Sequence, residues 1–304
     1  MSETLVLHDP ETYSRGFPHE HFRELRANAP ISHHDHPGWP NGYWAVVRHA
    51  DVQRVSRDSA TFRNAPHPFL EESADNSQAG TEGLLISLDA PEHLKLRKLI
   101  NRGFTPKRVA GLTDRLKARV DAIIDGLRDQ KSCDLVNDLA LWLPLHVIAD
   151  LVGVPEADRK QVFEWTELTF GFDPSVTPEQ RHEAALAMYA YADAMCVERQ
   201  DNPRDDLMSV LLHAEVDGER LTQMQLDLFF MLLQNAGSET TRNLITSGTV
   251  ALLEHPDQLA LLRSDLDLLP SAIEELVRFV TPVIQFVRTA ATDTEVARQP
   301  IRAG

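Results

Sequence analysis

The spacing of hydrophobic residues changes near residue 89. Before it, short apolar runs such as residues 44–47 lie among His, Pro and Gly, which favours short strands and loops over long helices. After it, apolar residues recur every three or four positions, as in residues 109–127. We predict a mainly α protein of one domain over residues 1–304, with a strand- and loop-rich part at 1–88 and a helical body at 89–304.

The longest predicted helix begins after Thr222, which forms a capping-box pattern with Gln225. It should run to Glu254, because Pro256 disfavours helix at the residue before it. About thirty residues at 1.5 Å each give a rod of about 45 Å. Its centre is weak, since residues 236–242 contain a Gly, which costs about 1 kcal/mol relative to Ala in a helix interior, and two Thr.

Small side chains share one face at this weak centre. Ala236 and Thr240 are four residues apart, so they leave a flat gap with a hydroxyl at its edge, in which a planar ligand could lie. Glu239 adds a carboxylate beside that hydroxyl, and together these groups could deliver protons. The alternative for Ala236-Gly237 is a close crossing by another helix. For the whole run 236–241 we favour a functional site.

Two further patterns pair charged residues on one helix. Asp89 and Pro91 predict a helix start, after which His93 and Arg97 stack four residues apart and repel unless an anion lies nearby. Later in the chain, Glu275 and Arg278 form an ion pair three residues apart in a helix that must end before Pro282. The apolar stripe of that helix places this pair on the opposite, solvent-facing side; the stripe comprises Ile273, Leu276, Val277 and Val280.

Charge and composition limit the possible partners. The 304 residues include 30 Lys and Arg against 46 Asp and Glu, a formal charge of −16, which argues against general binding of nucleic acid or anionic membranes. Residues 95–108 are an exception, because their basic side chains meet no acid and should attract an acidic partner; a solvated helix face is the alternative. This basic cluster comprises Lys95, Arg97, Lys98, Arg102, Lys107 and Arg108.

No feature of the sequence suggests secretion or membrane insertion. The N-terminus is acidic and lacks a signal-peptide pattern, and two cysteines in 304 residues suit a reducing compartment. The most apolar stretch, residues 139–154, contains Pro144 and Asp150 and falls short of a membrane span. We expect a cytoplasmic protein without a membrane anchor.

The run Ala236-Gly237-Ser238-Glu239-Thr240-Thr241 resembles the distal-helix motif of the cytochrome P450 monooxygenases, in which the helix passes over haem. The two charged pairs described above and residues 286–289 resemble further motifs of that family, in the same order. The resemblance implies a cytochrome P450 fold, which is a helical body with small β-sheets near the N-terminus.

The resemblance also implies roles for individual residues. Thr240 would hold and help protonate iron-bound dioxygen, and Glu239 would feed the proton relay. Glu275 and Arg278 would form a structural ion pair, which the family buries against a later segment of chain. Haem b would be bound by residues spread along the chain: His93, Arg97, Ala236, Gly237, Thr240 and Arg288.

The implied reaction inserts one oxygen atom from dioxygen into an unactivated C–H bond, with electrons passed from NAD(P)H through ferredoxin reductase and ferredoxin. The acidic ferredoxin would dock on Lys95, Lys98, Arg102, Lys107 and Arg108. Residues 145–155, 235–243 and 288–293 resemble the bacterial branch that hydroxylates sterol side chains and methyl-branched lipids. We therefore expect an apolar lipid, sterol or terpenoid substrate.

The family's iron ligand is a cysteine thiolate in a loop downstream of Arg288. Cys133 and Cys196 precede the motifs that this ligand should follow, so neither can be assigned that role. We expect a family member truncated before the cysteine loop. It should be inactive as a monooxygenase, since the thiolate promotes O–O cleavage.

Two other interpretations remain open. The runs His19-Glu20-His21 and His33-His34-Asp35-His36 suggest a metal site, although neither has the spacing of a helical zinc motif and both are predicted to lie in loops. Alternatively, the helical body is a non-catalytic module that binds an apolar ligand or an acidic protein.

Overall fold

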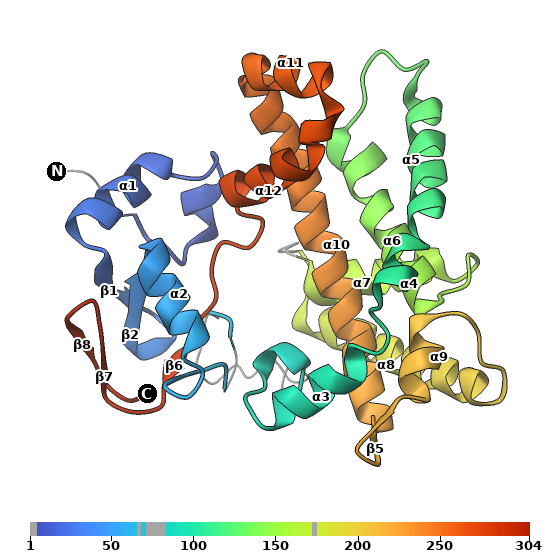
Figure 1. The fold of residues 1–304 in the computed structure, drawn as a ribbon, viewed down its shortest axis with the longest axis horizontal. Coiled ribbons are helices and arrows are strands. Elements are labelled where there is room, and N and C mark those ends of the chain that lie inside the picture. Colours follow the sequence, from blue (N-terminus) through green and yellow to red (C-terminus); the bar gives the residue numbers. More distant parts are fainter. Residues whose placement is uncertain (1–4, 66–67, 71–82, 172–174) are drawn as a thin grey trace. The chain divides into compact units, whose positions relative to one another are not determined.

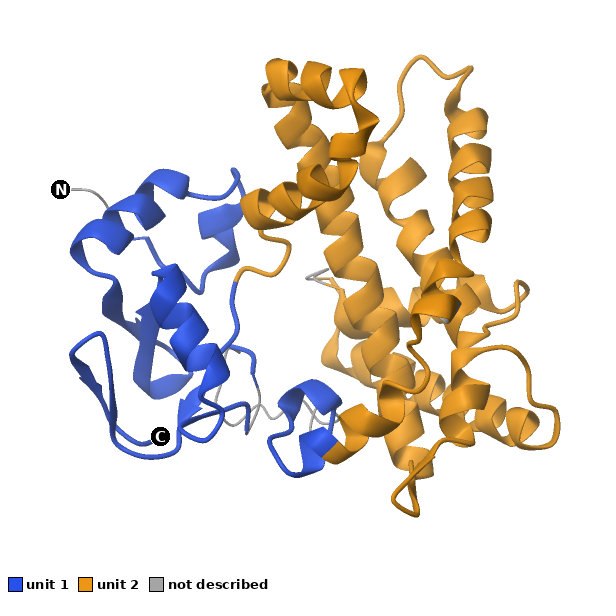
Figure 2. Cartoon of the chain, viewed as in Figure 1, with its two compact units in different colours: residues 1–94, 285–304 blue, residues 95–284 orange. Residues whose placement is uncertain are grey.

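The structure is a computed structural model that describes residues 5–65, 68–70, 83–171 and 175–304, apart from the side chain of Arg108. The chain divides into two compact units (Figure 2). Unit 1 comprises residues 1–94 and 285–304, and unit 2 comprises residues 95–284. This division does not test the prediction of a single domain, which stays a prediction.

Unit 1 combines short helices with two-stranded antiparallel sheets, paired as β1–β2, β3–β6 and β7–β8 (Figure 1). Its core is small and centres on Phe62, Ala290 and Val296. The elements are η1 (Pro10–Tyr13), α1 (His19–Asn28), β1 (Ile31–His36), β2 (Trp39–Val46), α2 (His49–Arg57), β3 (Phe62–Arg63), η2 (Leu85–Ser87), β6 (Thr289–Ala290), β7 (Thr294–Val296) and β8 (Gln299–Ile301).

Unit 2 is helical, apart from the small hairpin β4–β5, and is built around α10 (Figure 1). Helix α3 (Glu92–Ile100) crosses the boundary between the units. The remaining elements are α4 (Pro106–Ala110), α5 (Thr113–Leu127), η3 (Leu135–Ala140), α6 (Trp142–Val152), α7 (Arg159–Phe170), α8 (Pro178–Asp201), α9 (Leu207–Leu212), β4 (Glu215–Val216), β5 (Glu219–Arg220), α10 (Gln223–Glu254), α11 (Pro256–Ser264), η4 (Leu266–Leu268) and α12 (Leu269–Val280).

Helix α10 begins and ends where the sequence predicts. Thr222 is its N-cap and completes a capping box with Gln225, and His255 is its C-cap directly before Pro256. The N-terminal half is the most buried part, because Phe230 and its apolar neighbours pack against α6 and α8. The apolar run therefore anchors α10 in unit 2, and the weak centre follows directly after this anchor.

Helices α1 and α2 lie where we expected strands and loops, although the β1–β2 hairpin is present. Helix α3 begins at Glu92, close to the start that Asp89 and Pro91 predict, and the backbone N–H of His93 donates to the carbonyl of Asp89 at 2.9 Å. The carboxylate of Asp89 accepts hydrogen bonds from the backbone N–H groups of Asn64 and Ala65, at 2.9 and 3.1 Å. The side chain of Asp89 thus also makes a tertiary contact within unit 1.

One helical window, Leu135–Val152, is long and apolar enough to cross a membrane by length and composition. A single window of this kind is weak evidence for a span, because the core helix of a protein without a membrane anchor passes the same test. In the structure 39% of the window is buried, and both η3 and α6 pack against α10. The same apolar residues therefore serve the core of unit 2.

Candidate functional site

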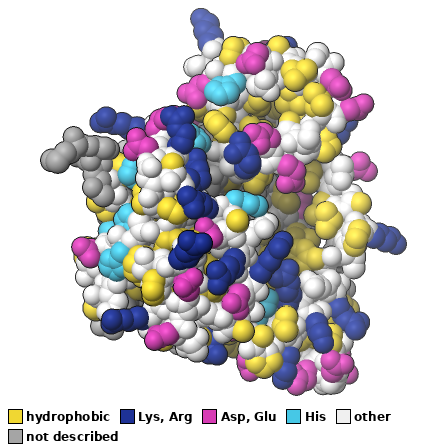
Figure 3. All heavy atoms as spheres, turned by 60° about the vertical axis from the view of Figure 1, so that its left-hand side comes forward, with side chains coloured by type: hydrophobic (Ala, Val, Ile, Leu, Met, Phe, Trp, Pro, Cys, Tyr) yellow, Lys and Arg dark blue, Asp and Glu magenta, His cyan; other side chains and the backbone are white. Residues whose placement is uncertain are grey.

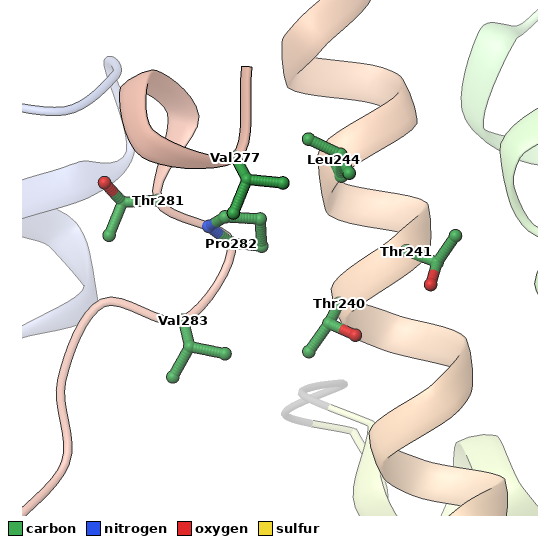
Figure 4. Close-up of a pocket in the computed structure, with 7 residues that line it drawn as sticks. All are labelled: Thr240, Thr241, Leu244, Val277, Thr281, Pro282 and Val283. Atoms are coloured by element: carbon green, nitrogen blue, oxygen red, sulfur yellow. The ribbon is translucent and has the colours of Figure 1, made fainter. Parts of the chain in front are cut away.

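A cavity of about 340 Å³ lies in unit 2 beside the centre of α10 (Figure 4). Helix α10 contributes Thr240, Thr241 and Leu244. The opposite wall comes from the end of α12 and the residues after it, with Val277, Thr281, Pro282 and Val283. Figure 4 shows that the side chains of Val277 and Pro282 face α10 across the space. The cavity thus has apolar side chains and threonine hydroxyl groups on both walls.

The hydroxyl of Thr240 is already engaged within the helix. It donates to the backbone carbonyl of Ala236 at 2.8 Å, and Ser238 likewise donates to the carbonyl of Gln234 at 2.6 Å. Such bonds to the preceding turn weaken and often bend a helix. The Thr240 hydroxyl therefore has a hydrogen-bond partner within α10 at the edge of the cavity.

The two explanations for Ala236-Gly237 apply to different residues. Ala236 is exposed on the same face as Thr240 and leaves that face open. Gly237 instead faces α6, because a Cβ atom added there would lie 2.3 Å from Cδ1 and 2.6 Å from Cγ1 of Ile148. Gly237 thus allows a close helix crossing, which was the alternative weighed from the sequence. Its predicted contact with haem stays a prediction.

Glu239 is partly buried and belongs to a small charge network. Arg242 donates to its Oε1 at 2.8 Å and also to the two carboxylate oxygens of Glu167 on α7, at 3.2 and 3.3 Å. Burial raises the pKa of Glu239, while the charge of Arg242 opposes that rise. A partly buried carboxyl with a raised pKa, next in sequence to the cavity-lining Thr240, is suited to exchanging protons.

The Glu275–Arg278 pair lies on the exposed face of α12, as the periodicity predicts. Two hydrogen bonds of 2.6 Å join the carboxylate to the guanidinium, and the side chains are 59% and 69% exposed. The bonds to Arg278 lower the pKa of Glu275. The pair is therefore formed but uncovered in these 304 residues.

Thr281 follows α12 directly and has an unusual backbone conformation. Its φ of 47° lies in the left-handed region, which a β-branched residue rarely adopts. The side-chain hydroxyl donates to the carbonyl of Arg278 at 3.1 Å. The conformation turns the chain so that Pro282 and Val283 line the cavity. Strain of this kind often marks a functional site.

The predicted anion-binding residues lie partly in unit 1. Arg288 directly precedes β6, its guanidinium lies 6.0 Å from the ring centre of Phe286, and burial lowers its pKa. On α3, His93 is half-buried and Arg97 is exposed, one turn apart. The structure thus brings His93 and Arg97 together on one helix, and their roles toward haem remain predictions.

The basic cluster is exposed along α3, α4 and the turn between them. Lys95 lies 3.7 Å from Glu219 of β5, and Lys98, Arg102 and Lys107 are exposed. The side chain of Arg108 lies outside the described part of the structure. The described side chains of this cluster, which all belong to unit 2, are therefore accessible to a partner protein. Lys95 is the one that already pairs with an acid of the same unit, Glu219.

The histidine runs do not lie in loops, contrary to our expectation. His19 and His21 occupy the first turn of α1, and His33, His34 and His36 lie on β1. Figure 3 shows histidine side chains on the surface, interspersed with acidic and basic ones. Among the described residues, no group of three or more His, Cys, Asp or Glu side chains has a metal-binding arrangement.

The two cysteines are free and neither lines the cavity. Cys133 is exposed before η3, whereas Cys196 is buried in α8. Burial raises the pKa of the Cys196 thiol, which disfavours the thiolate form that ligates iron. Among the described residues, neither cysteine is therefore placed to offer a thiolate to a group bound in this cavity.

Sequence reasoning missed several residues of the site. The apolar wall formed by Val277, Pro282 and Val283 had only a weak signal, namely a proline after a helix. The bridge from Arg242 to Glu167 joins residues 75 positions apart and had no signal at all.

The chain is similar to two groups of curated bacterial enzymes. It is 38% identical over 313 residues to a steroid C26-monooxygenase of Rhodococcus jostii, covering all of this chain and 66% of that protein. It is 38% identical over 300 residues to a methyl-branched lipid omega-hydroxylase of Mycobacterium tuberculosis, covering 93% of this chain and 69% of that protein. The chain thus spans about two thirds of the length of these relatives. No protein-family model matches it.

Solved structures of cytochromes P450 share the fold. One from Chondromyces apiculatus has a TM-score of 0.85 at 33% identity, covering 98% of this chain and 74% of the other. One from Mycobacterium marinum in complex with pseudoionone has a TM-score of 0.84 at 37% identity, covering 94% and 72%.

Proposed function

Because the chain belongs to the cytochrome P450 family, we propose that it forms the distal part of a haem-dependent monooxygenase that hydroxylates an apolar lipid, sterol or terpenoid. The observation that carries this proposal is the cavity beside α10, where Thr240 faces an apolar wall made by Val277, Pro282 and Val283. The family implies haem, and haem when bound supplies the chemistry that activates dioxygen.

We assign the distal wall of the haem site to the open face of α10. Ala236 has a small side chain and is exposed, so a planar group can approach the helix there. His93, Arg97 and Arg288 are the cations proposed to pair with the haem propionates, because two of them stack on α3 and the third is half-buried before β6.

We assign proton delivery to Glu239 and Thr240. The raised pKa of Glu239 keeps a larger share of this carboxyl protonated than an exposed one would have. The Thr240 hydroxyl can donate toward the cavity when it leaves the Ala236 carbonyl. Together they could pass protons from the surface network to a group bound beside α10.

The substrate class follows from the cavity wall and from the relatives. Leu244, Val277 and Val283 present aliphatic surface, which favours an apolar substrate. The names of the relatives specify steroids and methyl-branched lipids. We propose the same class here, and a cytoplasmic enzyme that receives electrons from ferredoxin and ferredoxin reductase through the basic cluster.

A haem titration of the purified 304-residue chain tests the site. We expect binding that weakens by roughly tenfold to a hundredfold in Ala236→Trp, the equivalent of about 1–3 kcal/mol of steric strain. Val250→Trp is the matched control, because Val250 is 46% exposed on the same helix but lies beyond the small-residue run 236–241. Equal binding by Ala236→Trp and the unaltered chain would place haem elsewhere.

The ligand and substrate proposals have their own readouts. We expect no thiolate-type carbon monoxide difference spectrum from the chain alone, because neither cysteine lines the cavity. Steroids and methyl-branched lipids should perturb the absorption of the bound haem, whereas small polar compounds should not. A chain that binds these lipids equally well without haem would instead support the non-catalytic module.

A further inference from the structure

Arg242 joins two helices of unit 2 through two carboxylates. One nitrogen of its guanidinium donates to both oxygens of Glu167 in the last turn of α7, and the other donates to Glu239 on α10. The exposed fractions of the side chains are 19% for Arg242, 22% for Glu239 and 42% for Glu167. The cation is thus shared between an inner carboxylate and an outer one.

The α7 end of this bridge is held firmly. A Cβ atom on Gly171 would lie 2.4 Å from the carbonyl oxygen of Glu167, so this close turn requires glycine. Arg181 of α8 donates to the carbonyls of Leu168 and Gly171, at 3.4 and 2.7 Å, and so caps the helix. The carboxylate of Glu167 therefore moves with the end of α7 as a whole.

We propose that Arg242 is a positioning residue that couples the location of the end of α7 to the orientation and charge of Glu239. When Glu167 accepts hydrogen bonds from the guanidinium, Arg242 is fixed beside Glu239, but its positive charge is shared between the carboxylates of Glu167 and Glu239. When α7 withdraws, Arg242 serves Glu239 alone and favours its ionised form. The proposal rests on the proton-delivery role given to Glu239 above. It adds that the position of α7 determines the orientation and charge of Glu239 in that role.

The physical basis is the competition between two anions for one cation. Burial disfavours the charge on Glu239, Arg242 favours it, and Glu167 disfavours it as a like charge. Among the described residues, these are the titratable groups that act on Glu239 from α10 and from the packed helix α7. Removing Arg242 should therefore raise the pKa of Glu239, whereas removing Glu167 should lower it.

The test is a carbon-13 NMR titration of Glu239 in the 304-residue chain, with the signal assigned by its loss in Glu239→Gln. The pKa of Glu239 should rise in Arg242→Gln, fall in Glu167→Gln, and stay near its original value in Arg242→Lys, which keeps the charge. Glu164→Gln is the matched control, because this neighbour on α7 pairs with Lys160 and does not contact Arg242.

Shifts of the Glu239 pKa in opposite directions in Arg242→Gln and Glu167→Gln support the coupling between α7 and Glu239. A purely structural bridge predicts otherwise, because loosening α7 by either substitution would admit water and lower the pKa of Glu239 in both variants. Shifts of the same sign, or no shift in Glu167→Gln, would overturn the proposal. The titration needs no haem, so its failure is distinct from a failure of the haem titration described above.

Discussion

At the scale of single residues, Gly237 shows how much a missing Cβ atom can matter. Replacing it with Ala would place a carbon 2.3 and 2.6 Å from atoms of Ile148 on α6. We expect Gly237→Ala to lower the free energy of unfolding by up to about 2 kcal/mol, because overpacking costs about 1–3 kcal/mol and the gain in helix propensity offsets about 1 kcal/mol of it. Urea unfolding followed by circular dichroism measures this change.

Gly248 in the same helix is the matched control. An added Cβ there meets the side chain of Leu276 at 3.6 Å, which is an ordinary contact. Gly248→Ala should therefore stabilise unit 2 by up to about 1 kcal/mol. Ile148→Ala combined with Gly237→Ala should lose less stability than the sum of the two single changes. Strict additivity would show that Ile148 is not the source of the clash.

At the level of single residues, the sequence could predict only part of the site. The run at 236–241 identified the site because local spacing places Ala236 and Thr240 on one face. It could not separate the open face at Ala236 from the crossing at Gly237, since only the position of Ile148 decides between them. Nor could it reveal Arg242 as a bridge, because its partner Glu167 lies on another helix.

At the scale of elements, a buried ion pair joins α8, α9 and α6. Arg199 is 2% exposed and Asp206 is 5% exposed, with 2.7 Å between Nε and Oδ2. Asp206 also caps α9 through Ser209, and Arg199 also donates to the carbonyl of Gly153 at 2.9 Å. One carboxylate thus neutralises a buried cation and begins a helix.

Asp206→Asn should lower the free energy of unfolding by about 1.5–3 kcal/mol, because the amide keeps the cap but leaves the charge of Arg199 less well paired. Thermal and urea denaturation measure the loss. Glu198→Gln is the control, since Glu198 is 39% exposed and its pairs with Arg199 and Arg204 should contribute no more than about 1 kcal/mol. Equal losses in both variants would contradict the role of burial.

The β1–β2 hairpin should become less stable in mild acid. His34 stacks on Tyr43, and its pKa is lowered by burial and by the nearby His33, His8 and His21, while Asp35 opposes this. Between the lowered folded value and the unfolded value of about 6.5, the unfolded chain binds more protons. Stability is thus full above this window and falls as the pH drops through it.

His34→Gln should remove that part of the pH dependence. Hydrogen exchange of the hairpin amides between neutral and mildly acidic pH provides the measurement, with His49→Gln on the exposed start of α2 as the control. An unchanged pH profile in His34→Gln would assign the titration to another group.

The ends of a helix could be predicted from the sequence only where the residues that determine them are adjacent to those ends. Thr222, Gln225 and Pro256 are next to the ends that they determine, so α10 was located correctly. The start of α3 at Glu92 also lies close to Asp89 and Pro91, which predict it, whereas the contacts of the Asp89 carboxylate with residues 24 and 25 positions earlier had no local signal. Helix α1 was missed because it has no side-chain cap to announce it.

At the scale of the whole molecule, α12 leaves apolar side chains uncovered. None of its residues is buried, and Leu269 and Ile273 are 41% and 48% exposed. Leu266 before it and Leu253 on α10 are 64% and 66% exposed. Exposed apolar side chains gathered on neighbouring elements, here the end of α10, η4 and α12, promote association. We therefore expect the 304-residue chain to self-associate with rising concentration.

Leu269→Lys combined with Ile273→Lys should reduce that association, while changing the free energy of unfolding by no more than about 1 kcal/mol, since both positions are solvent-exposed. Sedimentation velocity over a range of concentrations measures it. Leu186→Lys is the control, because Leu186 is 54% exposed on α8, outside this group. Association unaffected by the double substitution would place the contact on another surface.

The division into units was beyond the reach of sequence patterns. The change in periodicity near residue 88 predicts two parts within one domain, which stays a prediction. The return of residues 285–304 to unit 1 depends on the pairing of Phe62 with Ala290 and of Arg63 with Thr289. Two-residue strands so far apart carry no local signal.

That strand pairing also sets an order of events on the ribosome. Unit 2 is continuous from Lys95 to Ile284, so it can fold as soon as it has emerged. Phe62 is made before unit 2 but lacks its core partners, Ala290 and Val296, until the residues after unit 2 have been synthesised. The segment around Phe62 must thus wait for the whole of unit 2 to be made before it reaches its native core.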